Sequence, residues 1–445
     1  MSLVQIRPAA FYASYGCINM KNWEGLSLGR NAIAKILENY PVGSLTTLER
    51  LERPEAEAPI NYIITTQKGR YFLKQYRLKE VSDDHFRLLK FLETRRYPCV
   101  RLISTKDGSL NTSYRGRTFA LFNYVDGKQI YDLDYKSAYL LGKYLGRLHR
   151  ITSGFKASPA LADRKYLTLL FKRVTRIKIP RKAKPIIAFI SAGLPKTAVP
   201  KGTPVGTCHS EFTSDHALYK NGKIIAVIDW DGAGRDYMIH DLGSCLYSAF
   251  RYDKGKFVPD FNALSGILAG YESERRLTKW EREHIYEALM FGVFKNAIWS
   301  LSQEKIDWKC GELKIVDAIA QLNRETFYNS IHMRDEVRDL GYDVVYVPHR
   351  IITDHIACYN VRYKGRKIAP EVAIKLKIPL NQIWISEEYK KYEGGILYHE
   401  LQEIKYQHKG YDINTAHKMA KEDEKKFDSL LSLNNRKGLR RPHRK

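Results

Sequence analysis

The sequence predicts an α+β fold in which a strand-rich part comes first, a helix-rich part follows, and a smaller mixed region ends the chain. Strand-like patterns rich in β-branched and aromatic residues occupy three early segments: 44–53, 60–67 and 69–77. Apolar residues recur at helical spacing in three later segments: 135–150, 281–300 and 310–328. From residue 331 onward strand-like and helix-like stretches are mixed again.

The first strands and the first long helix each carry local signals. A break at Lys68-Gly69 predicts a hairpin between the second and third strands. In segment 82–94, Ser82 is placed to cap a helix whose first turn is acidic, which favours a helix N-terminus. The apolar face of this helix consists of Phe86, Leu89 and Leu92.

Bulk composition limits the class of protein. The chain of 445 residues is long enough for two or three domains. It has no 18-residue apolar run and no signal-peptide core, so we expect a cytoplasmic protein that does not span a membrane. Six cysteines without CxxC pairs fit a reducing compartment. The formal net charge of +25 is compatible with a generally basic surface or with an anionic partner such as a nucleotide or nucleic acid.

The most informative stretch is HSEFTSDHALYKNGKIIAVIDWD, residues 209–231. Glu211 is followed five positions later by His216, and a strand-like run then delivers Asp229 and Asp231 at its end. Phosphoryl transfer needs one acid near the attacking hydroxyl and further ligands for the Mg²⁺ that bridges the nucleotide phosphates. The spacing therefore predicts that chemistry.

This stretch resembles the aminoglycoside phosphotransferase and homoserine kinase-like group, small-molecule kinases with a bilobal protein-kinase-like fold. Their pattern is roughly HGDxxxxN, a hairpin, IDFxxA and a later Asp-Leu. The matching positions here are His209, Glu211, His216, Ile228-Asp229-Trp230, Ala233 and Asp241-Leu242. His216 replaces the Asn and Glu211 replaces the Asp of the group's pattern. The resemblance extends over residues 30 to 330.

The resemblance implies an ATP- or GTP-dependent kinase that uses Mg²⁺ and acts on a small-molecule alcohol not identified by the sequence. Its catalytic residues would be Glu211, which orients or deprotonates the acceptor hydroxyl, and His209, which braces the loop. The Mg²⁺ ligands would be Asp229 and His216, with Asp231 as an additional acid.

The same resemblance assigns the nucleotide contacts. Lys74 in the third strand would pair with the α and β phosphates, and Asn61 matches a recurrent Asn of the loop before it. The adenine would meet the backbone around Phe122 and Tyr124. The loop at 53–61 has no glycine and carries Glu55 and Glu57, which would repel phosphate. The partner of Lys74 is left open: either Asp84 or none, since the best register places His85 at the usual acid position.

The last region contains a second candidate site. In a helix beginning near Gly395, His399 and Glu403 are four residues apart and share a face, with Glu400 beside them. His417 follows on a later helix. The HExxE string resembles the metal helix of zincin-like peptidases, which implies a Zn²⁺ site with Glu400 as the base. The alternative is a charged helix with a His399–Glu403 pair.

These patterns divide the chain into four parts. We predict an N-terminal extension and kinase-like N-lobe at 1–125, a kinase-like C-lobe at 126–330, a small α+β domain at 331–432 and a basic tail at 433–445. Three functions stay open at this stage. The first is a small-molecule kinase fused to a metal-binding domain. The second is a degenerate kinase fold whose C-terminal domain is a metal-dependent peptidase or nuclease. The third is a non-enzymatic protein that binds nucleic acid.

Overall fold

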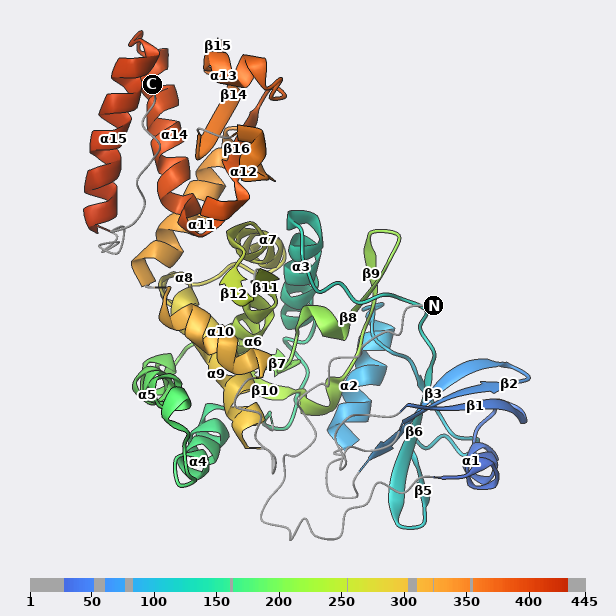
Figure 1. The fold of residues 1–445 in the computed structure, drawn as a ribbon. Helices are drawn as coiled ribbons and strands as arrows, with labels where there is room; N and C mark the ends of the chain where they lie inside the picture. The colour runs from blue at the N-terminus through green and yellow to red at the C-terminus, as the bar shows by residue number, and fades with distance from the viewer. Residues whose placement is uncertain are drawn as a thin grey trace. The chain divides into compact units, whose positions relative to one another are not determined.

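The structure, a computed structural model, describes most of the chain (Figure 1). The described residues are 28–51, 61–76, 83–160, 163–253, 255–302, 310–322, 324–352 and 355–430. The sequence-derived loop acids Glu55 and Glu57, the cap Ser82 and the basic tail lie outside them. In the described part of the chain, no helix is both long enough and apolar enough to cross a lipid bilayer.

The chain forms two compact units. The first contains residues 1–251 and 266–317, and the second contains residues 252–265 and 318–445. Three elements are cut by this division: β11 (Phe250–Asp253), α7 (Phe261–Glu272) and α10 (Gly311–Ala320). The boundaries at residues 125 and 331 drawn from the sequence stay predictions.

The first unit opens with an antiparallel sheet of six strands in the order β1-β2-β3-β6-β4, with β5 paired to β6. The strands are β1 (Leu45–Leu51), β2 (Asn61–Thr66), β3 (Gly69–Tyr76), β4 (Leu102–Ile103), β5 (Thr112–Tyr114) and β6 (Arg117–Asn123). The predicted hairpin is confirmed, because Thr66 pairs with Gly69 across a two-residue turn.

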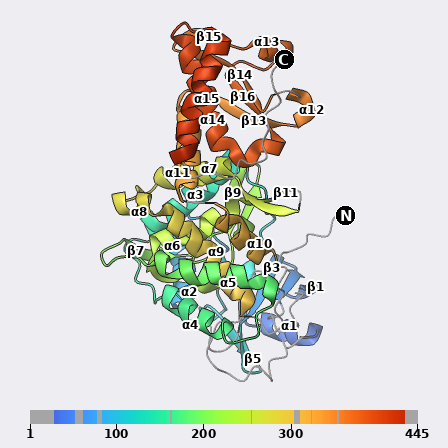
Figure 2. The ribbon, with the colours of Figure 1, turned by 60° about the vertical axis from the view of Figure 1, so that its left-hand side comes forward.

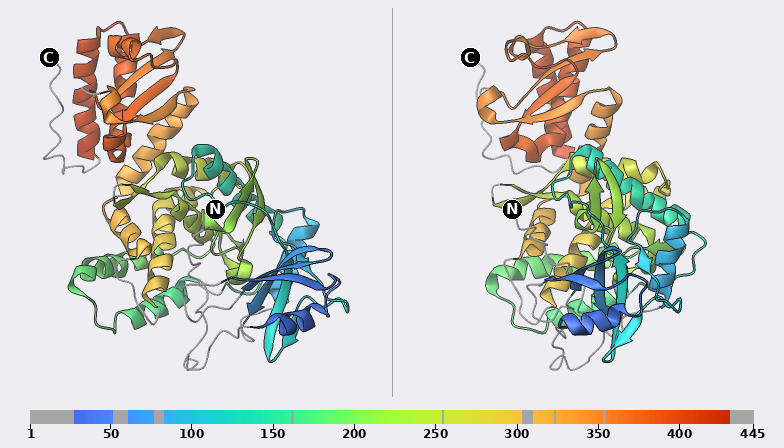
Figure 3. Two further views of the ribbon diagram at one scale, coloured as in Figure 1. Left: turned by 45° about the vertical axis from the view of Figure 1, so that its right-hand side comes forward. Right: turned by 90° about the vertical axis from the view of Figure 1, so that its right-hand side faces the viewer.

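Helix α1 (Arg30–Leu37) covers one face of this sheet (Figure 3). Its Ile33, Ile36 and Leu37 share a buried core with sheet residues such as Ile64 and Leu73. The predicted helix at 82–94 is present as α2 (Asp83–Thr94). Its predicted apolar residues Phe86, Leu89 and Leu92 are buried, which confirms the helical spacing.

The rest of the first unit is mainly helical. Its described helices of eight or more residues, besides those already given, are α3 (Tyr135–Ile151), α4 (Arg164–Val174), α5 (Lys184–Gly193), α6 (Met238–Leu246) and α9 (Ile285–Leu301); α8 (Lys279–Glu283) is shorter. Two short ribbons lie between them: β7 (Val205–Cys208) with β10 (Gly234–Tyr237), and β8 (Ala217–Lys220) with β9 (Lys223–Val227). The 209–231 motif runs from the end of β7 through the β8–β9 ribbon to the segment before β10, and its candidate site residues lie in the connections between these strands.

The second unit is a four-stranded sheet with helices. Its strand order is β13-β16-β14-β15, with β13 parallel and β14 antiparallel to β16. The strands are β13 (Asp343–Val347), β14 (Ala357–Tyr363), β15 (Arg366–Ile368) and β16 (Gln382–Ser386), and β12 (Lys256–Pro259) belongs to a separate ribbon. The helices are α11 (Arg324–Asp339), α12 (His349–Ile352), α13 (Glu371–Lys375), α14 (Glu393–His408) and α15 (Ile413–Leu430).

Helices α14 and α15 lie side by side in this unit (Figures 1 and 2). The apolar residues Leu397, Leu401 and Ile404 of α14 are buried in one core with residues of the sheet. A buried ion pair joins the start of α14 to α11, with Arg334 Nη2 2.9 Å from Glu393 Oε2. Because a buried charge is costly without a partner, this pair fixes how the two helices meet.

Candidate active site

The loop after β7 is anchored by one buried carboxylate. Asp241, on α6, accepts hydrogen bonds from the backbone N–H groups of His209 (2.8 Å) and Ser210 (2.9 Å). On its other side the Asp241 carboxylate contacts His149 Nε2 at 3.1 Å, and His149 Nδ1 bonds to the Tyr271 hydroxyl at 2.7 Å. The Asp241 side chain therefore fixes the backbone that carries Glu211.

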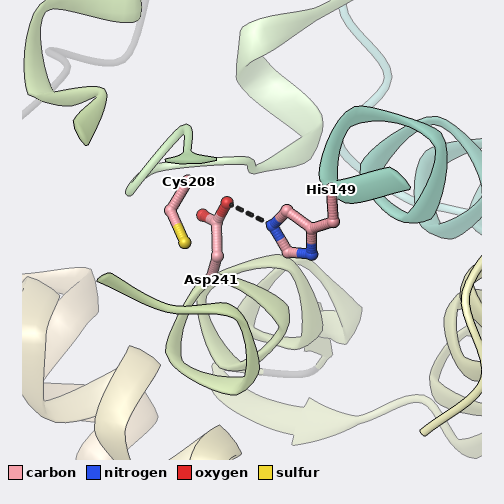
Figure 4. A group of neighbouring side chains, drawn as sticks. All are labelled: His149, Cys208 and Asp241. Atoms are coloured by element: carbon pink, nitrogen blue, oxygen red, sulfur yellow. Dashed lines mark hydrogen bonds and ion pairs between the residues drawn. The ribbon is translucent and has the colours of Figure 1, made fainter. Parts of the chain in front are cut away.

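Figure 4 shows Asp241 and His149 turned toward each other with Cys208 beside them. The nitrogen, oxygen and sulfur atoms of these three side chains are close enough to hold a metal ion. However, the Asp241 oxygens are already bonded to two N–H groups and to His149. Burial also raises the pKa of the Cys208 thiol well above its usual range, which keeps it protonated. The cluster is therefore a hydrogen-bonded brace.

His209 is completely enclosed by the loop. Its Nε2 donates to the Ile228 carbonyl at 2.9 Å, and its Nδ1 accepts from the Glu211 N–H at 3.3 Å. Burial, followed by the nearby His216, lowers the pKa of His209 to about 4, so the ring is neutral. Since both ring nitrogens are engaged, this geometry favours the bracing role over proton transfer.

Glu211 and His216 lie together with Asp229. The ligand atoms of the three side chains are all within 4.8 Å of one another. His216 Nδ1 donates to the Glu211 carbonyl at 2.7 Å, which leaves Nε2 facing Asp229 Oδ2 at 3.6 Å. That nitrogen is buried and has no hydrogen-bond partner among the described residues. A lone pair facing a carboxylate is unfavourable unless a cation or a proton lies between them.

Electrostatics at the three residues favour a positive charge. Burial lowers the pKa of His216, but the carboxylates of Asp215, Asp229 and Glu211 outweigh burial and raise it to about 9. Burial raises the pKa of Glu211 to about 8, although His216 and Lys295 act in the opposite direction. The site therefore attracts either protons or a cation that replaces them.

Asp229 has an unusual backbone. Its φ of 63° and ψ of 57° are left-handed, a conformation that Asp tolerates better than most residues. This turn comes directly after β9 and Ile228, and it aims the carboxylate at Lys74 as well as at His216. Lys74 Nζ, on β3, is 3.1 Å from Asp229 Oδ1 and 2.8 Å from Asp231 Oδ1.

The partner of Lys74 that was left open from the sequence is therefore neither Asp84 nor absent. Asp84 instead bonds to Arg87 at 2.9 Å and to the Ser158 hydroxyl. His85 takes the position facing the site: its Nδ1 donates to the Trp230 carbonyl at 2.9 Å, and its Nε2 is 3.8 Å from Asp231. Burial lowers the pKa of His85, so it adds no stable charge beside Lys74.

The remaining nucleotide candidates lie in the sheet. The Asn61 side chain is buried and accepts a hydrogen bond from the Gln75 N–H at 3.4 Å. Phe122 pairs in the sheet with residues of both β3 and β4. The Tyr124 N–H donates to the Arg70 carbonyl at 3.1 Å, and the Arg70 guanidinium lies 3.9 Å from the Tyr124 ring centre.

The C-terminal candidates come together within the second unit. His417 Nδ1 is 2.7 Å from Glu403 Oε2, and His399 Nε2 is 3.5 Å from the same oxygen. The two imidazole nitrogens are 3.1 Å apart. Glu400, predicted as the base, is not part of this cluster of potential ligand atoms.

Two residues that contact these sites were not predicted from the sequence. Glu424 bonds His399 Nδ1 at 2.9 Å, and it is seven residues after His417, so helical periodicity was the available signal. Lys295 is buried on α9 and donates to the Ser210 carbonyl. Its signal was a lone lysine within the apolar run IYEALMFGVFKNAIWSL.

The antiparallel sheet followed by a mainly helical part in the first unit is a protein-kinase-like fold. The sequence profile of the phosphotransferase enzyme family matches residues 53–277, half of the chain. The chain therefore belongs to this family and is a phosphotransferase that acts on an alcohol group.

Curated relatives of similar sequence are homoserine kinases. The homoserine kinase of Caulobacter vibrioides is 27% identical over 256 residues, which covers 56% of this chain and 78% of the relative. That of Rhizobium meliloti is 27% identical over 260 residues, covering 56% and 77%.

Solved structures show the same fold. An amicoumacin kinase in complex with AMP-PNP, Ca²⁺ and Ami has a TM-score of 0.51 and 16% identity, covering 66% of this chain and 92% of that one. A spectinomycin phosphotransferase with ADP and spectinomycin has a TM-score of 0.50 and 12% identity, covering 69% and 98%.

Proposed function

We propose that this protein is an ATP-dependent kinase that phosphorylates a hydroxyl group of a small molecule. Its catalytic residue would be Glu211, its metal ligands His216 and Asp229, and its phosphate-binding residue Lys74. The observation that carries the proposal is the buried His216 Nε2, which faces Asp229 without a hydrogen-bond partner among the described residues. A hydrogen-bonded structural histidine would not leave this atom bare.

A divalent cation fits this arrangement. When a cation replaces the proton on His216, the Nδ1–H bond to the Glu211 carbonyl sets the tautomer of the neutral ring, and Nε2 would present its lone pair to the ion. Asp229 supplies a carboxylate oxygen on the opposite side. His216 and Asp229 would hold Mg²⁺ or a related ion, which would neutralise the charge of the nucleotide phosphates. Asp231 forms an ion pair with Lys74 and would be an additional acid near the bound ion.

The protein's own groups account for the remaining chemistry. Lys74, held between two carboxylates, would donate to the α and β phosphates of ATP. Glu211 would accept the proton of the acceptor hydroxyl as that oxygen bonds to the γ-phosphorus and the bond from phosphorus to the bridging oxygen breaks. The products are ADP and a phosphate ester.

Homoserine is the first acceptor to test, because the curated relatives given above are homoserine kinases. An identity of 27% supports the reaction type more than the acceptor. Other amino alcohols follow as a second group of acceptors.

Calorimetric titration of ATP with Mg²⁺ into the wild-type protein and Asp229→Ala tests the proposal. We expect binding that requires Mg²⁺ and is lost in Asp229→Ala. A parallel titration with GTP settles the nucleotide. Equal binding by wild type and Asp229→Ala, or no binding of either nucleotide, would overturn the kinase assignment.

We further propose that the second unit binds a divalent metal, with Zn²⁺ the best fit, through His399, Glu403 and His417. Tetrahedral zinc with bonds of about 2.0–2.1 Å places its ligand atoms roughly 3.3 Å apart. The three pairs here are 2.7, 3.1 and 3.5 Å apart. Glu424 orients His399 through Nδ1, and the Tyr359 hydroxyl donates to Glu403 Oε1 at 2.8 Å. Such outer partners are typical of metal ligands.

Elemental analysis of the full-length protein after zinc addition and dialysis tests this second proposal. We expect His417→Gln to bind one zinc fewer per chain than the wild type. The matched control is His408→Gln, which changes a histidine of α14 outside the cluster. Equal zinc in wild type and His417→Gln would overturn the site.

Nucleic acid as a further partner is proposed for one surface of the first unit. Between Arg164 and Ser210 the chain carries no Asp or Glu. Exposed basic side chains on α4 and the following segment include Lys165, Lys172, Arg173, Arg176, Lys178 and Arg181. Electrophoretic shift of a labelled RNA that weakens steeply with salt would support this partner, and no shift at low salt would exclude it.

A further inference from the structure

Lys295 is a buried cation in a largely apolar helix. It is only 4% exposed, and most of its neighbours along α9 are buried apolar residues. A buried ammonium is costly unless it is bonded to acceptors. Lys295 Nζ donates to the backbone carbonyl of Ser210, the residue directly before Glu211. Its placement at the catalytic loop therefore needs an explanation beyond core packing.

Ser210 is the strained residue of this loop. Its φ of 73° is left-handed, a conformation that is unfavourable for an L-residue and that Gly adopts freely. The Ser210 side chain does not offset this cost, because its buried Oγ has no hydrogen-bond partner among the described residues. The conformation is therefore held through the backbone alone.

Both backbone groups of Ser210 are bound. Asp241 accepts from its N–H at 2.9 Å, and its carbonyl accepts from Lys295 and, at 3.4 Å, from the Ser244 hydroxyl. An anionic and a cationic side chain thus hold the two peptide groups that flank the Ser210 Cα. Charged hydrogen bonds are stronger than neutral ones, particularly where water is excluded.

Two glycines allow α9 to come this close. A Cβ on Gly292 would lie 2.3 Å from the Gly243 carbonyl oxygen, and a Cβ on Gly243 would lie 1.9 Å from the Ala288 carbonyl oxygen. Helices α6 and α9 therefore approach backbone to backbone at this level. Lys295 follows Gly292 by three residues, about one turn, so the same contact delivers its ammonium to the loop.

We propose that Lys295 is a positioning residue that holds Ser210 in the left-handed conformation and thereby aims Glu211 at the acceptor. This inference rests on the proposed function for the role of Glu211. Lys295 also lies close enough to oppose the burial-driven rise in the pKa of Glu211. A Ser at the position where the family pattern has Gly makes such a clamp necessary.

The test combines Lys295→Met with Ser210→Gly in the full-length protein. Glycine removes the conformational cost that the clamp offsets. Hydrogen–deuterium exchange of residues 209–211 is followed together with the turnover of ATP with Mg²⁺, with water or homoserine as acceptor. For Lys295→Met we expect loop amides that exchange at least tenfold faster and turnover lowered on the order of 10²-fold, as for a misplaced catalytic group.

The double variant decides the mechanism. In the Lys295→Met background, we expect Ser210→Gly to raise turnover about tenfold, because glycine removes the cost of the left-handed backbone at this position. We also expect it to restore most of the protection of the loop amides from exchange. Faster exchange throughout α9 without any correction by Ser210→Gly would show packing alone and overturn the proposal. Unchanged exchange and turnover in Lys295→Met would overturn it as well.

A second substitution at Lys295 covers a failure of the first to fold. If Lys295→Met fails to fold, Lys295→Gln, which keeps a neutral donor, is compared with and without Ser210→Gly by the same criteria. Exchange can be measured whether or not the protein binds ATP. The protein could therefore show no ATP turnover while the loop amides exchange faster in Lys295→Met and recover their protection when Ser210→Gly is added. That result would support the positioning role of Lys295 and overturn the kinase assignment.

Discussion

His216 Nε2 lies 3.6 Å from Asp229 Oδ2 in a buried site, a pairing that requires either a proton on the imidazole or a cation between the two groups. The related family pattern has Asn at the His216 position. An amide oxygen suits Mg²⁺, whereas imidazole suits softer divalent ions. The identity of this one side chain therefore bears on which cation the enzyme prefers.

Replacing His216 by Asn is expected to shift the cation preference toward Mg²⁺. The ratio of ATP turnover with Mg²⁺ to that with Mn²⁺ should rise by on the order of tenfold, because an oxygen ligand replaces a nitrogen. Steady-state assays at matched free cation measure it. Asp229→Ala serves as control and should lose activity with both ions. An unchanged ratio in His216→Asn would remove His216 from the cation site.

Glu211→Gln is expected to lower turnover by about 10²-fold or more while leaving ATP affinity within a few-fold, because it removes a proton acceptor and keeps the shape. Single-turnover assays and calorimetry separate the two effects. Glu211→Asp retains the carboxylate one methylene further back and should keep more activity than Gln. Equal activity of wild type and Glu211→Gln would show that another group accepts the proton.

Lys74→Met is expected to weaken ATP binding and to destabilise the protein. Removing the ammonium leaves the Asp229 and Asp231 carboxylates buried beside each other, a change that costs about 3 kcal/mol. Chemical denaturation measures the loss, and added Mg²⁺ should recover part of it. Lys74→Arg keeps the charge and is the control. Full stability of Lys74→Met without cation would contradict the ion pairs described above.

The second unit should respond to pH in opposite ways with and without zinc. Burial lowers the pKa of His399, but hydrogen bonds to Glu403 and Glu424 outweigh burial and raise it to about 9. A raised pKa stabilises the metal-free fold fully below pH 6.5, and this stabilisation is lost as the pH rises through about 9.

Zinc requires neutral imidazole, so its binding strengthens over the same pH range. We expect the Tm of the metal-free second unit to fall between pH 6.5 and 9 and the zinc-induced rise in Tm to grow. Scanning calorimetry of the full-length protein measures both, with His417→Gln as control. A zinc effect that is equally large in His417→Gln would place the metal elsewhere.

Gly292→Ala is expected to destabilise the first unit by about 1–3 kcal/mol or more, since its methyl group would meet the Gly243 backbone. Thermal unfolding measures the change. Gly154→Ala is the matched control, because a Cβ there meets nothing within 4 Å. A Gly292→Ala protein as stable as Gly154→Ala would mean that α6 and α9 do not pack as closely as described.

The sequence predicted the order of the first strands, the hairpin at Lys68-Gly69 and the placement of Glu211, His216 and Asp229 around one loop. These features follow from short-range rules: alternation of apolar residues, turn chemistry and the fixed spacing of a motif within about twenty residues. The HExxE helix was predicted in the same way, since His399 and Glu403 share a face by helical periodicity alone.

Tertiary structure decided the partners of these residues. Lys74 bonds to Asp229 and Asp231, more than 150 positions away, and Asp84 turns to Ser158 instead. Lys295 reaches the catalytic loop only because glycines bring α9 against α6. A sequence fixes which side chains share a strand or a helix face, because the backbone geometry is local. Which buried charges meet depends on how distant elements pack, and that is set by the whole core together.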